Sequence, residues 1–185
     1  METVDLRKRR FIKLSLQAGL LSALPNTLHA ALQSDEKPEP RKLSLYNIHT
    51  GEFLETCYHD GIDYLSGNLA RINYLLRDYR TGGVVPIDKQ LLDTLYRIHR
   101  KIDGCGTFSV ISGYRSPATN AMLRRITSGV AKNSYHMKGK AIDIRLRGCS
   151  TGKLRDICIQ THAGGVGYYP KSNFVHVDVG PVRCW

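Results

Sequence analysis

The stretch SYHMKGKAIDIRL, residues 134–146, decides how this chain folds. Its second half alternates between apolar and polar positions, which indicates a strand. Ile142 and Ile144 fall on the core face of that strand, and Asp143 falls on the opposite face. His136 precedes the turn predicted at Gly139, so the chain can bring its imidazole back toward Asp143.

A second stretch with the same period is FVHVDV, residues 174–179. Val175 and Val177 face the core, and His176 and Asp178 share the other face. Together with the histidine and aspartate of the first stretch, His176 could complete a catalytic zinc site that keeps a coordination position for water. Histidines on the polar face of a strand are more often solvated or hydrogen-bonded, so spacing alone does not decide between the two interpretations.

The rest of the chain supplies further strands and three helices. Periodicity and turn residues predict strands at 43–49, 53–58, 107–112, 140–146, 165–169 and 174–179 and helices at 62–80, 88–103 and 116–127. Ser116 followed by Pro117 suits the start of the third helix. This order predicts an α+β domain with a small antiparallel sheet and flanking helices.

The N-terminus has the three parts of a secretory signal. Basic residues up to Lys13 precede an apolar stretch from Leu14 to Leu24, and small residues follow to Ala30. The stretch is too short and polar to span a bilayer, so we expect no membrane span after cleavage. We predict a signal peptide at 1–30, a linker at 31–42 and a catalytic domain at 43–185. The alternative is a basic N-terminal arm.

The export route is suggested by KRRFIK, residues 8–13, which resembles the twin-arginine signal. If Phe11 fixes the register, the pair is Lys8 and Arg9, a departure from two arginines. Five cysteines follow the signal, and in an oxidising compartment they could form one or two disulfides, with at least one left unpaired. They are Cys57, Cys105, Cys149, Cys158 and Cys184.

Three ordered motifs resemble those of the zinc D-alanyl-D-alanine metallopeptidase superfamily. They are SGYRS at 112–116, SxHxxGxAxD at 134–143, and GVGYY followed by FVHVD within 165–178. The closing run GVGYYPKSNFVHVDVGPVRCW is similar to the YcbK-like branch, the murein endopeptidase K group. The resemblance covers about residues 43–185.

The resemblance implies roles for single residues. His136 and Asp143 match the first two zinc ligands, and His176 matches the third. Arg115 matches the motif arginine, which is implied to bind the substrate carbonyl or carboxylate and to stabilise the oxyanion.

The general base is a departure from the pattern. Several branches have an acid three positions before the last histidine ligand, and here that position is Asn173. Asp178 is the nearest alternative, either as base or as a residue that orients a ligand imidazole. Ser134 could cap the turn before His136 or bind peptide. Tyr168 could line the cleft or pack as an ordinary strand tyrosine.

The resemblance implies a periplasmic zinc endopeptidase that cuts peptide cross-links of peptidoglycan, by the same likeness between diaminopimelate residues. The alternatives are a D,D-carboxypeptidase and a non-catalytic peptidoglycan-binding module. Removing residues 1–30 lowers the formal charge from +11 to +8, which suits acidic peptide stems as the partner. We expect a monomer and no nucleic-acid partner, since no nucleic-acid-binding motif is recognised.

Overall fold

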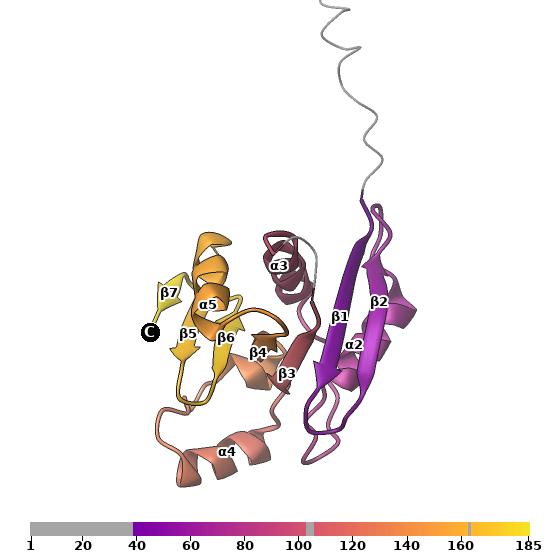
Figure 1. Cartoon of the computed structure of the whole chain (residues 1–185). Helices are drawn as coiled ribbons and strands as arrows, with labels where there is room; N and C mark the ends of the chain where they lie inside the picture. The colour runs from indigo at the N-terminus through magenta and orange to yellow at the C-terminus, as the bar shows by residue number, and fades with distance from the viewer. Residues whose placement is uncertain (1–38, 103–105, 163) are drawn as a thin grey trace, which may run out of the picture. The chain divides into compact units, whose positions relative to one another are not determined.

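The computed structural model of the chain describes residues 39–102, 106–162 and 164–185. Within these ranges seven strands form one sheet in the order β2-β1-β3-β4-β6-β5-β7 (Figure 1). The strands are β1 (Arg41–Asn47), β2 (Phe53–His59), β3 (Phe108–Ser112), β4 (Ala141–Leu146), β5 (Gly165–Tyr169), β6 (Phe174–Asp178) and β7 (Arg183–Cys184). The α+β class and the six predicted strands are confirmed.

The sheet is larger and more mixed than expected. β1 runs parallel to β3 and β5 runs parallel to β7, while the other neighbouring strands are antiparallel. A parallel pair needs a crossover connection, and between β1 and β3 the intervening chain contains two helices, α2 (Ser66–Leu75) and α3 (Lys89–Arg100). β7 has only two residues, which is too short to produce a periodic signal.

Side-chain caps start three of the four α-helices in the described ranges. Asp88 accepts from the backbone at the start of α3, Ser116 does so for α4 (Pro117–Ile126), and Ser150 does so for α5 (Thr151–Gln160). The first predicted helix is shorter than expected: Tyr64 pairs with His59 as an isolated bridge, so α2 begins only at Ser66, and it ends at Leu75. α5 was not predicted from the sequence.

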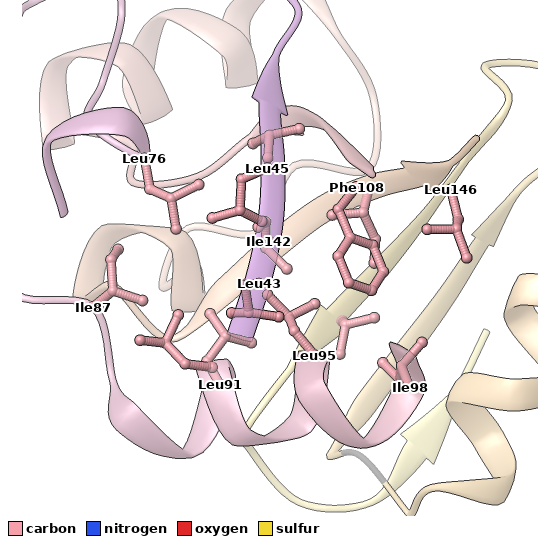
Figure 2. Close-up of a cluster of buried hydrophobic side chains, with 14 of the residues drawn as sticks. Leu43, Leu45, Leu76, Ile87, Leu91, Leu95, Ile98, Phe108, Ile142 and Leu146 are labelled. Atoms are coloured by element: carbon pink, nitrogen blue, oxygen red, sulfur yellow. The ribbon is translucent and has the colours of Figure 1, made fainter. Parts of the chain in front are cut away.

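One face of the sheet carries the hydrophobic core. The inward side chains of β1, β3, β4, β5 and β6 join those of α2, α3 and α5 in a single buried cluster. Figure 2 shows part of it, with Leu91, Leu95 and Ile98 of α3 packed beneath Leu43 and Phe108. Since this face is covered by helices, the polar side chains of the strands gather on the other face.

A β-bulge adjusts which side chains share that polar face. The register between β3 and β4 shifts between Val110 and Ser112, so that Ser112 lies opposite Asp143. Without the shift, Ser112 would follow Val110 toward the core, because side chains two apart in a strand share a face. The bulge therefore brings a hydroxyl beside the carboxylate.

The N-terminal predictions concern residues that lie outside the described ranges. This applies to the signal peptide at 1–30 and to the first eight residues of the predicted linker, 31–38. Among residues 39–102, 106–162 and 164–185, no helix has the length and apolar character needed to cross a membrane.

The described ranges contain four of the five cysteines. Cys57, Cys149, Cys158 and Cys184 form no disulfide with one another. Burial raises the pKa of the Cys158 thiol to about 12, so this side chain behaves as a small apolar core residue. Cys105 lies outside the described residues.

Candidate metal centre

Three polar side chains from separate elements meet on the face of the sheet opposite the hydrophobic core, here called the open face. His136 lies on the short 3-10 helix η1 (Tyr135–Lys138), and Asp143 on β4 is paired with His176 on β6. Asp143 Oδ1 lies 2.8 Å from His176 Nδ1 and 3.2 Å from His136 Nε2. All three are buried, and the structure brings together the three residues that the sequence singled out as metal ligands.

Backbone geometry brings His136 to the two strands. Gly139 ends η1 with a φ of 63°, and a Cβ at this position would lie 2.5 Å from the carbonyl oxygen of Pro86. Only glycine suits both the left-handed turn and the close approach. Ser134 Oγ accepts a hydrogen bond from the His136 amide at 3.3 Å, so the structure places Ser134 as the cap of this turn.

Hydrogen bonds on the far side of each imidazole decide which nitrogen faces the cluster. His136 Nδ1 lies 2.7 Å from the carbonyl oxygen of Gly113, which can only accept. His176 Nε2 lies 3.1 Å from Asp178 Oδ2. With protons on these two atoms, His136 Nε2 and His176 Nδ1 are left bare beside Asp143. Two bare nitrogens and a carboxylate form a donor set that suits a transition metal.

The charges of the cluster follow from burial and from its neighbours. Burial lowers the pKa of His136, which favours the neutral, metal-binding form. Burial alone would raise the pKa of Asp143, but His136, His176 and Arg115 outweigh it and hold that pKa far below its usual range. Burial likewise opposes protonation of His176, yet the two neighbouring carboxylates, Asp143 and Asp178, favour the protonated form and raise its pKa. Asp143 is therefore a carboxylate.

The loop after β3 places Arg115 beside the cluster. Its Nε donates to Ser112 Oγ at 2.7 Å, and its Nη2 donates to Asp143 Oδ2. The Arg115 amide also donates to the carbonyl oxygen of His136. Because the side chain stays 15% exposed, the guanidinium can meet both the carboxylate and a molecule from solvent.

A buried acid fixes this loop from behind. Asp78 is 2% exposed and accepts from the Ser116 amide at 2.8 Å and from the Arg80 amide at 3.0 Å. Burial alone would raise the pKa of Asp78, but hydrogen bonds led by those of Thr119 and Ser116 lower it to about 2. Sequence reasoning missed Asp78, which lies in a segment without a motif.

Asp178 is fully buried, and both of its carboxylate oxygens accept hydrogen bonds from more than one donor. Its Oδ1 accepts from the amides of Gly165 and Gly180, both at 2.8 Å. Its Oδ2 faces His176 Nε2 and accepts from Arg183 Nη2 at 2.6 Å. Burial alone would raise the pKa of Asp178, but these bonds keep it well below its usual range. The carboxylate lies behind His176, on the side away from Asp143.

Two other candidate positions lie away from the cluster. Asn173 is exposed in the turn before β6, with φ at 52°, and its side chain contacts Thr151 Oγ1. Tyr168 pairs with Val175 on the core face of the sheet, and Arg155 of α5 packs over its ring. The structure therefore does not bring Tyr168 or Asn173 to the three central side chains.

Comparison with known proteins gives consistent matches. The family model described as peptidoglycan L,D-endopeptidase MepK matches residues 35–185. The peptidoglycan L,D-endopeptidase MepK of Escherichia coli K12 is 42% identical over 185 residues, which is all of both chains. The protein of Haemophilus influenzae named probable peptidoglycan L,D-endopeptidase MepK is 44% identical over all of this chain and 98% of its own length.

Proposed function

Because the chain belongs to the peptidoglycan L,D-endopeptidase MepK family, within the YcbK-like branch of the zinc D-alanyl-D-alanine metallopeptidase superfamily, we propose that it is a zinc-dependent murein endopeptidase. It hydrolyses peptide cross-links between the stems of peptidoglycan. The observation that carries the proposal is the meeting of His136, Asp143 and His176 with their bare donor atoms turned toward one another.

Each of the three side chains would offer one donor group to the metal. His136 would bind through Nε2, His176 through Nδ1 and Asp143 through its carboxylate. Zinc held by two imidazoles and one carboxylate would supply a Lewis acid that activates water and polarises a carbonyl. The rigid positions of the ligands on β4, β6 and η1 mean that little reorganisation is needed to bind the metal.

Arg115 is the residue that we assign to the developing negative charge. Its guanidinium is anchored by Ser112 and Asp143, so it is already oriented before substrate binds. A fixed cation at the edge of a buried site stabilises an oxyanion strongly, because water is largely excluded there. Asp78 supports this role by fixing the loop that carries Arg115.

We assign Asp178 to orientation of His176. The position of Asp178 behind the imidazole and its four other donors leave no lone pair turned toward the metal side. A carboxylate in this position fixes the tautomer of a ligand histidine and raises its basicity. The predicted alternative, Asp178 as general base, would require the carboxylate to leave these bonds.

The cross-link and the location complete the proposal. The names of the relatives support cleavage of an L,D bond, and we propose the link between two diaminopimelate residues. Since peptidoglycan lies outside the cytoplasmic membrane, we propose that residues 1–30 direct export to the periplasm, that the segment between residue 30 and β1 acts as a linker, and that the chain from β1 onward forms the catalytic domain of a monomer. The boundary predicted after residue 42 is two residues too late, because Arg41 and Lys42 already pair within the sheet.

Digestion of purified muropeptides tests the function directly. The protein without residues 1–30 is incubated with cross-linked dimers, with and without chelator, and the products are weighed by mass spectrometry. An endopeptidase converts dimers to monomers that keep all of their stem residues, and chelator should abolish this hydrolysis. Release of free D-alanine would favour the carboxypeptidase, and binding without turnover at full zinc occupancy would favour the non-catalytic module.

A further inference from the structure

An aromatic side chain that the catalytic motifs do not explain lies against the metal centre. Trp185 follows β7, and its ring centroid is 5.3 Å from that of His176 at an angle of 47°. Figure 1 shows β7 beside β5, which in turn borders β6, the strand of His176. Sequence reasoning had given Trp185 no role.

The indole is held at several points. Its Nε1 donates to the Tyr169 hydroxyl at 2.8 Å. The Trp185 amide donates to Val166, and the Trp185 carbonyl accepts from Tyr168. The guanidinium of Arg183, which also bonds Asp178, lies 5.0 Å from the ring. The position of the side chain is therefore fixed before any ligand arrives.

Gly167 makes room for this ring. It is paired with His176 across β5 and β6, so any side chain there would stand on the open face. A Cβ at Gly167 would come within 2.8 Å of the indole. Although so constrained, Trp185 remains 51% exposed. A core tryptophan would be covered, whereas a fixed and half-exposed ring beside a reactive centre is typical of a ligand-binding surface.

We propose that Trp185, fixed by Tyr169 and seated over Gly167, is a substrate-binding wall beside the metal centre. It contacts the peptide residue on one side of the scissile bond. This inference rests on the proposed endopeptidase function and assigns one side of its substrate site. The indole offers a large, rigid apolar surface to the peptide plane and aliphatic side chain of a stem residue, at small cost in conformational entropy.

The sheet order supports this placement. The ligands lie on β4 and β6, and Trp185 lies beyond them next to β5. On the other side, a cavity of about 490 Å³ is lined by Arg145 of β4, Ser109 of β3 and Tyr46 of β1. A peptide crossing the strands from Trp185 to this cavity passes Asp143 and His176. An endopeptidase has to bind the peptide on both sides of the scissile bond. Along this path Trp185 would bind one side and the cavity the other.

Trp185 is the only tryptophan of the chain, so its fluorescence reports on this site alone. Titrating the zinc-loaded enzyme with the uncross-linked monomeric muropeptide, the product of the reaction, should change the emission of Trp185 in a saturable way. Emission that stays unchanged while calorimetry shows that the muropeptide binds would overturn the proposal.

Kinetics of three variants complete the test. Trp185→Ala should raise KM by roughly 30-fold, the loss typical of removing an aromatic side chain that ligand binding buries, and should change kcat less. Trp185→Phe should recover part of the affinity, and Gly167→Ala should raise KM because it displaces the ring. Ile62→Ala, which removes an exposed apolar side chain outside the site, is the matched control.

Measurements of zinc affinity distinguish a substrate-binding role of Trp185 from a role in which Trp185 only packs against His176. If Trp185→Ala keeps the KM of the wild type, or if its whole defect is a lower zinc affinity restored by added zinc, the wall assignment is wrong. A wild-type protein that binds the monomeric muropeptide with a change in emission but hydrolyses no dimer would contradict the proposed function and leave the wall assignment standing.

Discussion

The exchange Asp178→Asn tests how the metal centre is organised, because it keeps the size of the side chain and removes one acceptor. The amide oxygen can replace only one of the two carboxylate oxygens. If it stays near the amides of Gly165 and Gly180, the new NH₂ group faces His176 Nε2 and the guanidinium of Arg183. The NH₂ group, His176 Nε2 and the guanidinium of Arg183 are then all hydrogen-bond donors, so none of them finds an acceptor in the others.

The imidazole can relieve this conflict by changing its tautomer. His176 Nε2 would accept from the new NH₂ group, and the proton would move to Nδ1, the atom that faces Asp143. That proton must be lost before the metal binds. We therefore expect zinc affinity to fall by roughly 10- to 100-fold, the range typical of losing a hydrogen-bond partner of a ligand histidine.

Two measurements on the same protein check this expectation. Zinc affinity is determined by competition with a chromophoric chelator, and kcat is measured on cross-linked muropeptides at rising zinc. Excess zinc should restore most of the rate. Asp156→Asn, the same exchange at an exposed site on α5, should behave as wild type. Unchanged zinc affinity with a loss of roughly 100-fold or more in kcat would refute the reasoning and identify Asp178 as the general base.

Further predictions concern the metal, the cation, the loop and export. His136→Ala should abolish activity and lower bound zinc, and full zinc occupancy in that variant would contradict the ligand assignment. Arg115→Ala should keep its zinc and lose roughly 100-fold or more in kcat, measured at saturating substrate. The pKa of Asp78 is lowered to about 2 from an ordinary 3.8, so it stabilises the fold above pH 4, and this contribution of about 2 kcal/mol is lost as pH falls toward 2. Denaturant titrations at both pH values should show a smaller difference for Asp78→Asn. Changing Arg9 and Arg10 both to Lys should prevent export, checked by fractionation, and normal periplasmic levels would contradict the predicted signal.

Strand periodicity predicted the faces of the sheet because each strand buries only one side. Alternation placed Ile142 and Ile144 in the core and Asp143 opposite them, and the structure confirms this. The same reasoning failed at α5. Its buried residues Leu154, Ile157 and Cys158 mark one helical face, but Gly152 and the polar side chains around them obscure the apolar pattern.

Features of the site that depend on long-range contacts could not be predicted. The bulge that turns Ser112 toward Asp143 arises from pairing between strands and leaves no period in the sequence. Asp78 is 38 positions from Ser116, and only the folded chain shows that its carboxylate holds the loop of Arg115. Motif resemblance located Arg115, but the residue that fixes it lies outside every motif.

The charges of the site explain how a buried polar cluster can be stable before a divalent ion binds. Asp143 is paired with Arg115 and Asp178 with Arg183, so the four charges cancel when both imidazoles are neutral. Unpaired buried carboxylates would be costly, and these pairs remove most of that cost without using the donor atoms that face the metal. A divalent ion would then leave the centre with an excess of positive charge. This excess favours the acidic stems of peptidoglycan and the oxyanion that forms when a peptide bond between them is attacked.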